Sequence, residues 1–123
     1  WVELIQSYGD TVMMVDSDGF IGELLPLFIE AGFESTWPVE VAAGNEINDF
    51  RKIYGHQIAY GGGVDKRAIA AGGKVMLAEL ERLRPVIEDG GFIPGCDHGV
   101  PPDISWPNFL AYSRRLAELT GWR

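Results

Sequence analysis

The chain has 123 residues, a formal net charge of −8 and 46% hydrophobic residues. This length supplies one domain with a single core, and the apolar content is typical of a folded chain and excludes a disordered one. The negative charge repels phosphate backbones and anionic lipid, which excludes nucleic acid and membrane surfaces as expected partners.

The cysteine content and the start of the chain bear on its compartment and its completeness. Cys96 is the only cysteine, so no internal disulfide can form, and no apolar run approaches the ~18–20 residues of a membrane span. Both features predict a cytoplasmic protein. Residues 1–10 are typical of the end of an upstream helix, with no initiator methionine and no signal segment. We therefore expect residues 1–123 to form a single partial domain.

The first predicted strand is TVMMV, residues 11–15, a β-favouring run that stops at the turn-prone residues 16–19. Behind it, residues 22–33 predict a helix of about ten residues with apolar side chains at helical spacing. Its proline is tolerable near the first turn, and Gly32 is placed to end it. Strand and helix together form one βα unit.

Two further units follow the same pattern. Residues 37–41 are rich in β-favouring side chains, and Asn45 is the expected N-cap of the helix behind them. A third strand lies in HQIAYGGG, residues 56–63. It is followed by a short helical turn at residues 67–72 and a longer helix that runs into Pro85. The chain therefore repeats strand and helix, with one insertion.

The last unit contains the most reactive side chains. Residues 90–96 predict a strand, and Ser105 is a suitable N-cap for the final helix. Four apolar residues share one face of that helix: Phe109, Tyr112, Leu116 and Leu119. Strands that alternate with helices at this spacing need parallel pairing. The sequence thus predicts an α/β fold of four βα units with parallel strands.

Chemically reactive side chains follow each predicted strand. The carboxyl ends of parallel strands share one edge of a sheet, where α/β proteins bind their ligands, so we expect these side chains to converge on one cleft. The candidates are Asp16 and Asp18 after the first strand, Glu40 at the end of the second, Asp65 and Arg67 after the third, and Cys96 and His98 after the fourth.

Four units could form half of an eight-stranded barrel or a small open sheet. No GxGxxG or GxxxxGK[ST] turn follows any strand, which removes the best support for a nucleotide-binding open sheet and favours the half barrel. A half barrel exposes two strand edges and the inner face of its sheet, which can pair with another chain. We therefore expect a homo-oligomer.

Four stretches of the chain resemble the last four βα units of the uroporphyrinogen decarboxylase superfamily, whose members are (β/α)8 barrels. They are MMVDSDGFIGELLPLFIEAGF, PVEVAAGNEINDFRKIYG, YGGGVDKRAIAAG and GGFIPGCDHGVPPDISWPNF. The resemblance covers almost the whole chain and is strongest in the last two stretches. It implies the carboxy-terminal half of a barrel and one of two activities: cobalamin-dependent methyl transfer or decarboxylation of uroporphyrinogen.

In the zinc methyltransferases of this superfamily, a His-x-Cys pair and a later Cys bind the metal. Carried over, the pair falls on Asp16 and Asp18, and the later Cys falls on Cys96. Carboxylate oxygens are admissible zinc ligands, so the resemblance implies a zinc site formed by Cys96, His98 and Asp18, with Asp16 as a further candidate. A corrinoid protein is then the implied partner that carries the methyl group.

In the decarboxylase, a histidine in a Gly-His-Gly loop borders the substrate, and His98-Gly99 lies at the matching place. A tetrapyrrole with many carboxylates calls for several basic groups, but the strand-end loops offer only Lys66 and Arg67. The resemblance therefore favours methyl transfer between a small substrate and a corrinoid protein. Decarboxylation of uroporphyrinogen in haem biosynthesis remains the alternative, and a non-catalytic fragment that self-assembles is a third reading.

The roles of the acidic residues and the histidines stay open at this stage. Asp16 and Asp18 suit either helix caps or site residues that act as ligands or bases. Glu40 either points into the barrel mouth as a base or ligand or lies outside in a salt bridge. His98 could act as a proton donor, bind a metal, or fix its loop by a hydrogen bond to a backbone carbonyl. His56 precedes its strand, so we expect a structural role for it at the opposite end of the sheet.

The other candidates also have two readings. Cys96 is either a small buried apolar residue or a thiol ligand. Asp65 and Arg67 form either an N-cap with a solvated arginine or an anion clamp on the substrate. The glycine run that ends at Gly63 allows close backbone approach by a substrate, or simply a tight turn.

Overall fold

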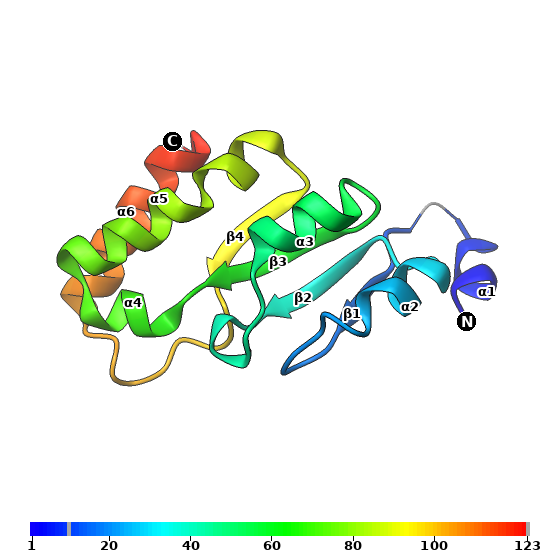
Figure 1. Cartoon of the computed structure of the whole chain (residues 1–123), viewed down its shortest axis with the longest axis horizontal. Coiled ribbons are helices and arrows are strands. Elements are labelled where there is room, and N and C mark those ends of the chain that lie inside the picture. Colours follow the sequence, from blue (N-terminus) through cyan, green and yellow to red (C-terminus); the bar gives the residue numbers. More distant parts are fainter. Residues whose placement is uncertain (10, 123) are drawn as a thin grey trace.

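The computed structural model describes residues 1–9 and 11–122, and Asp10, within the predicted upstream helix end, lies outside the described residues. Figure 1 shows a twisted sheet of four parallel strands in the order β1-β2-β3-β4, with helices between them. The predicted α/β fold of four βα units is confirmed. The strands are β1 (Met14–Asp16), β2 (Ser35–Val39), β3 (Ala59–Val64) and β4 (Phe92–Cys96).

Six α-helices and one 3₁₀ helix complete the described part of the chain. None of the α-helices is both long and apolar enough to cross a membrane. They are α1 (Val2–Gln6), α2 (Leu25–Glu30), the 3₁₀ helix η1 (Val41–Ala43), α3 (Ile47–Tyr54), α4 (Lys66–Ala71), α5 (Gly73–Asp89) and α6 (Trp106–Thr120).

The first two strands begin and end at residues that differ from the prediction. β1 starts at Met14 rather than at residue 11 and includes Asp16, because only Met14–Asp16 pair with β2. β2 ends at Val39, so Glu40 lies just after the strand as the N-cap of η1 rather than inside it. This shift places the Glu40 side chain in the loop at the strand end.

Two helix starts also differ from the expected ones. The regular part of α2 is only six residues long, because a turn at residues 22–24 precedes it. The N-cap of α3 is Glu46, whose carboxylate accepts a hydrogen bond from the backbone N–H of Asn48. Asn45, the predicted cap, is instead buried and bonds to two neighbouring loops.

Helix α5 continues through Pro85 to Asp89, whereas the sequence predicted an end at that proline. A proline inside a helix removes one backbone hydrogen bond. Here Leu80, Leu83 and Val86 are all buried on the sheet side of the helix, so packing on both sides of Pro85 offsets that loss.

The hydrophobic core lies between the sheet and one layer of helices. Tyr60 of β3 and Phe92 of β4 point into it, and Tyr60 stacks on Phe50 of α3. Helix α6 contributes the buried Tyr112, with Phe109, Leu116 and Leu119 packed beside it as the sequence predicted. Ser105 caps this helix, also as predicted, with its hydroxyl accepting from Asn108 N–H.

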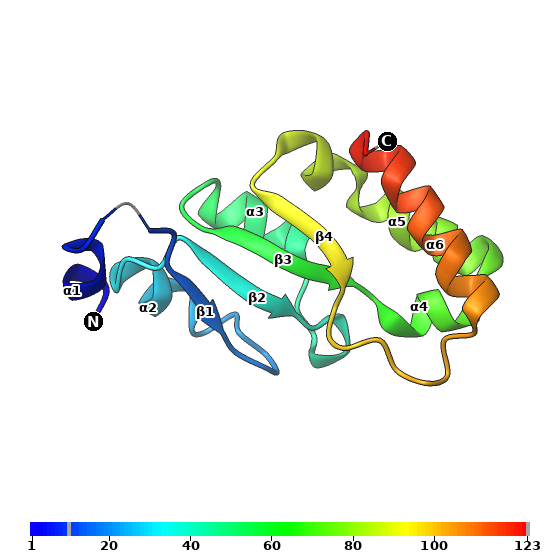
Figure 2. The same ribbon diagram turned by 180° about the vertical axis from the view of Figure 1, so that it is seen from behind.

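The other face of the sheet carries no helix within the described residues. Figure 2 views the sheet from this side, with α3 behind it. Register partners in a parallel sheet point to the same side, so Met14, Trp37, Gly61 and Ile93 share this face. A Cβ at Gly61 would lie 2.0 Å from the Trp37 ring and one at Gly95 3.4 Å from it, so the tryptophan packs over one glycine of β3 and one of β4.

Candidate functional site

All four strand-to-helix loops lie at one edge of the sheet, the lower edge in Figure 1. The four strand ends therefore share one edge of the sheet, as the predicted parallel pairing requires. Polar contacts of Asp97, Glu40 and His98 cross between the loops and define the site. We call Asp18, Glu40, Lys66, Asp97 and His98 the strand-end cluster.

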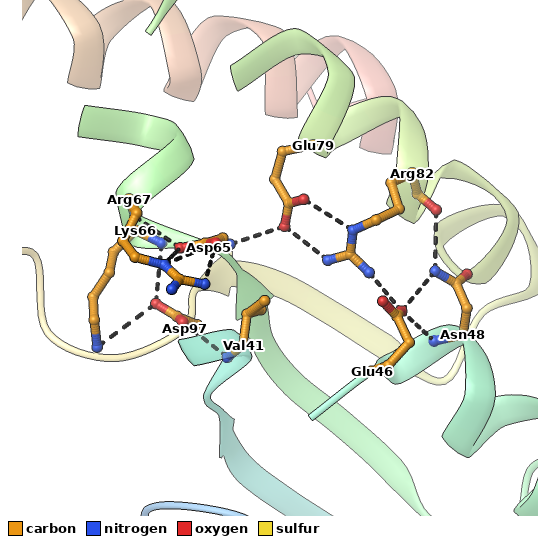
Figure 3. A network of polar contacts seen from close by, with 9 residues as sticks. All are labelled: Val41, Glu46, Asn48, Asp65, Lys66, Arg67, Glu79, Arg82 and Asp97. Atoms are coloured by element: carbon orange, nitrogen blue, oxygen red, sulfur yellow. Dashed lines mark hydrogen bonds and ion pairs between the residues drawn. The ribbon is translucent and has the colours of Figure 1, made fainter. Parts of the chain in front are cut away.

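Asp97 is the central residue of this cluster and is completely buried. It follows β4, and its two carboxylate oxygens accept hydrogen bonds from the backbone N–H of Val41 at 3.0 Å and of Lys66 at 3.2 Å. The Lys66 ammonium lies 3.9 Å from the same carboxylate. Figure 3 shows Asp97 between these two residues, which follow β2 and β3. One carboxylate thus joins the ends of three strands.

Glu40 connects the first loop to the third. Its carboxylate accepts a hydrogen bond from Gly19 N–H at 2.7 Å and lies 3.5 Å from the Lys66 ammonium. The hydrogen bond from Gly19 is the main cause that lowers the pKa of Glu40, and the charge of Lys66 lowers it further. Glu40 is therefore ionised at neutral pH and serves as a charge partner for Lys66.

Asn45 fixes the first loop against the second. The residue is buried, its side-chain oxygen accepts from Ile21 N–H, and its amide donates to the carbonyls of Gly19 and Glu40. These bonds satisfy backbone groups of the first loop, and the Glu40 carbonyl also accepts from Ala43 N–H in η1. Asn45 is consequently a positioning residue for both loops.

His98 and Asp18 come from opposite ends of the sheet order and meet at the open side of the edge. The Nε2 atom of His98 lies 3.5 Å from an Asp18 carboxylate oxygen, and both side chains are half-exposed or more. Asp18 does not cap α2, whose N-cap is Leu24. An imidazole beside a carboxylate is a common arrangement for proton transfer, because the carboxylate orients the ring and stabilises its charged form.

Asp65 and Arg67 bind each other. Asp65 caps α4 by accepting from Arg67 N–H, and its carboxylate also forms a bidentate ion pair with the Arg67 guanidinium. On the other side, Glu79 accepts from Asp65 N–H and pairs with Arg82, which also pairs with Glu46 (Figure 3). The N-cap reading of the sequence is therefore confirmed for Asp65, and Arg67 is already neutralised.

Cys96 lies at the end of β4 and is packed against the core. Its Sγ atom lies 4.0 Å from the Gly99 carbonyl oxygen. Burial is the main cause that raises the pKa of the thiol, so the neutral form predominates at pH 7. These features fit the packing role that the sequence left open.

The rate of Cys96 alkylation should reflect the raised pKa of its thiol. We expect iodoacetamide to react with Cys96 more slowly at pH 7 than with a free thiol, with a half-maximal rate above the ordinary pKa of 9.0. The rate is measured by mass spectrometry from pH 6 to pH 11 on the folded chain, with N-acetylcysteine as the reference thiol. A half-maximal rate below pH 9 would contradict the burial account and indicate a stabilised thiolate.

The predicted zinc ligands are not gathered into a metal site. Within residues 1–9 and 11–122, no three side chains of His, Cys, Asp or Glu lie together so that they could hold a metal ion. Asp18 and His98 meet, but Cys96 faces the core, and Asp16 is exposed at the end of β1. The residues present therefore do not fit the zinc site that the resemblance implied.

Gly63 and His56 have structural explanations in the contacts that surround them. Gly63 adopts a φ of +71°, and a Cβ there would lie 3.3 Å from the Phe92 ring. His56 lies at the opposite edge of the sheet, where its ring binds Asp89 at 3.1 Å and Arg51 at 2.8 Å. The structural role predicted for His56 is confirmed.

Sequence reasoning missed the residues that hold the loops together. Asp97 is not among the candidates predicted from the sequence, Lys66 is one of two strand-end cations there, and Asn45 is only an expected helix cap. A signal for Asp97 existed in its position directly after the fourth strand, the same position that singled out Asp65 after the third.

Comparison with known proteins gives no assignment: no protein-family model, no curated protein and no solved structure matches the chain.

Proposed function

We propose that the strand-end cluster is part of the active site of a uroporphyrinogen decarboxylase-like barrel enzyme that transfers a methyl group between a small substrate and a corrinoid protein. The observation that supports this proposal most is the exposed His98–Asp18 pair at 3.5 Å, placed beside the Glu40–Lys66 pair at the same sheet edge. A proton donor and a fixed pair of charges then lie at the strand-end edge, where parallel α/β enzymes place their catalytic residues.

In this proposal His98 acts as the general acid. The bond between the methyl carbon and the heteroatom of the substrate breaks, and its electron pair stays on the heteroatom, which takes a proton from the His98 imidazolium. The methyl carbon forms its new bond to the reduced corrinoid of the partner protein, which supplies the electron pair. Asp18, which lies 3.5 Å from Nε2, keeps the imidazole oriented. This acid role needs no metal at Cys96.

The charges at this edge favour methyl transfer over the alternative reaction, decarboxylation of uroporphyrinogen. A substrate with many carboxylates needs unpaired cations, but Lys66 lies close to Glu40 and Asp97, and Arg67 is held by Asp65. A small substrate with a methylated heteroatom needs only one proton donor. The carboxylate-rich edge therefore suits the smaller and less acidic substrate.

The His98→Ala variant tests the acid role. We expect it to lower kcat by about 10²–10⁴-fold, because a positioned general acid contributes that much to a rate. The assay measures transfer of a labelled methyl group to reduced cobalamin from methanol, methylamines, methanethiol and methoxylated aromatic acids. It uses the longest natural form of the chain. Far-UV circular dichroism confirms that each variant is folded.

His56→Ala is the matched control, since His56 also pairs with an aspartate but at the opposite edge of the sheet. We expect its rate to equal that of the wild type. Equal rates for wild type and His98→Ala would contradict the acid role. Formation of coproporphyrinogen from uroporphyrinogen, with no methyl transfer, would favour decarboxylation over the proposed function.

A further inference from the structure

Three consecutive backbone N–H groups after β3 each donate to a carboxylate. Asp65 N–H donates to Glu79 at 3.0 Å, and Arg67 N–H donates to the side chain of Asp65 at 2.8 Å. Between them, Lys66 N–H donates to Asp97 at 3.2 Å. The first N–H groups of a helix have no acceptor within the helix, and these groups begin α4. The carboxylates therefore fix the backbone at Lys66 and on both sides of it.

Glu79 is the one of these three carboxylates that comes from the helix layer. It belongs to α5, and only 11% of its side chain is exposed. Arg82, three residues further along α5, holds it with a bidentate contact, Nε to one oxygen at 2.9 Å and Nη2 to the other at 2.7 Å. Figure 3 shows Glu79 between Asp65 and Arg82. The guanidinium offsets the cost of placing a carboxylate in a mostly buried position and sets the direction of its oxygens.

Arg82 is itself held by the start of α3. Its Nη1 atom donates to Glu46, the N-cap of that helix, at 2.5 Å. Its backbone carbonyl accepts a hydrogen bond from the side-chain amide of Asn48 at 3.2 Å. Arg82 thereby connects the start of α3 to the start of α4 through Glu79.

The position of Lys66 matters to the strand-end cluster because Lys66 carries its ammonium charge. The ammonium lies 3.5 Å from Glu40, at the outer limit of a hydrogen bond, so even a small displacement of the backbone would break this contact. Glu40 in turn accepts from Gly19 N–H, and Gly19 directly follows Asp18, the partner of His98. Lys66 thus helps to hold the loop that carries Asp18.

We propose that Arg82 is a positioning residue of the strand-end cluster. Acting through Glu79, it fixes the backbone of Asp65 and Lys66 and keeps the Lys66 ammonium beside Glu40. Arg82 lies in the helix layer, so its action on the cluster is indirect. Its effect on a rate rests on the proposed function, whereas its effect on the position of Lys66 does not.

Amide NMR of the longest natural form of the chain tests the position of Lys66 without an assay of activity. In Arg82→Gln, which lacks the charge and the fork, we expect the Asp65 and Lys66 amides to shift. We also expect their hydrogen exchange to become about tenfold faster or more, because Glu79 is no longer held. Unmoved Asp65 and Lys66 amides in this variant would overturn the proposal, whatever its rate.

Arg84→Gln is the matched control. Arg84 also lies on α5 and forms a bidentate contact with a glutamate three residues earlier, Glu81, at 2.7 and 2.8 Å. We expect this variant to leave the Lys66 amide in place. The amides of Ile93 and Ser113, which line the apolar groove between β4 and α6, should shift in neither variant. Equal shifts of the Lys66 amide in both arginine variants would mean a general change in α5 and would contradict the proposal.

A double-mutant cycle shows whether Arg82 acts through Glu79. Glu79→Ala removes the acceptor of Asp65 N–H, so Arg82→Gln in that background should move the Lys66 amide little further. An effect of the same size in both backgrounds would mean that Arg82 acts through Glu46 alone, and the proposed route would be wrong.

The methyl-transfer assay described above supplies the second readout. We expect Arg82→Gln to lower kcat about 10–100-fold, as when a remote change misplaces a group of an active site. Arg82→Lys keeps the charge but not the fork, so it should recover part of the rate and shift the Lys66 amide by an intermediate amount. That variant also carries the test if Arg82→Gln does not fold. If the wild type transfers no methyl group, the proposed function fails, and the amide shifts still decide the role of Arg82.

Discussion

Replacing Asp97 by alanine is expected to lower the free energy of unfolding by about 3 kcal/mol, the cost of leaving buried partners without an acceptor. The carboxylate is fully buried and accepts from the backbone N–H of Val41 and of Lys66. Without it, both N–H groups lose their partner, and the nearby Lys66 ammonium loses one of its two counter-charges. Urea unfolding followed by circular dichroism measures the change.

Asp103→Ala is the matched control for Asp97→Ala. Asp103 lies in the same loop after β4 but is exposed. We expect its loss to change stability by less than about 0.5 kcal/mol, as is usual for exposed positions. A loss at Asp97 no larger than that at Asp103 would contradict the role of Asp97 as the residue that joins three strand ends.

Gly61→Ala is expected to destabilise the fold by about 2–3 kcal/mol, in the range of overpacked sites. The new Cβ would lie 2.0 Å from the Trp37 ring, so the ring and the strand beneath it must separate. In the double variant with Trp37→Leu, the clash disappears, and Gly61→Ala should then cost much less. Thermal unfolding of the four proteins of this cycle measures the coupling.

Gly99→Ala is the control for a glycine with room, because no atom lies within 4 Å of a Cβ built there. We expect it to leave stability nearly unchanged. Equal costs for Gly61→Ala with and without Trp37 would show that the glycine is needed for a reason other than ring packing. That outcome would reopen the reading in which a ligand approaches the glycine run.

The order of elements was predictable because it depends on local patterns. Short β-favouring runs that alternate with amphipathic stretches predict parallel βα units, and the structure has them in the expected order. Element ends were less predictable where packing decides them. Pro85 lies inside α5 because the helix is held on the sheet by residues before and after it, which no local signal at the proline records.

The candidate site was predictable in its location and not in its contacts. The rule that strand ends converge placed His98 and Asp18 at one edge, where they meet. The role of Asp97 depends on Val41 and Lys66, which are 56 and 31 residues away along the chain. Contacts at such separations follow from the twist and register of the sheet, which single-sequence patterns do not specify.

The most direct test of the central claim, that four strand ends form one ligand site, is amide NMR of the chain during titration with methylcobalamin. We expect the amides of Gly19, Val41, Lys66 and His98 to shift together along one binding curve, with His56 unmoved. Shifts confined to the groove between β4 and α6, or separate binding curves for the four loops, would contradict the claim.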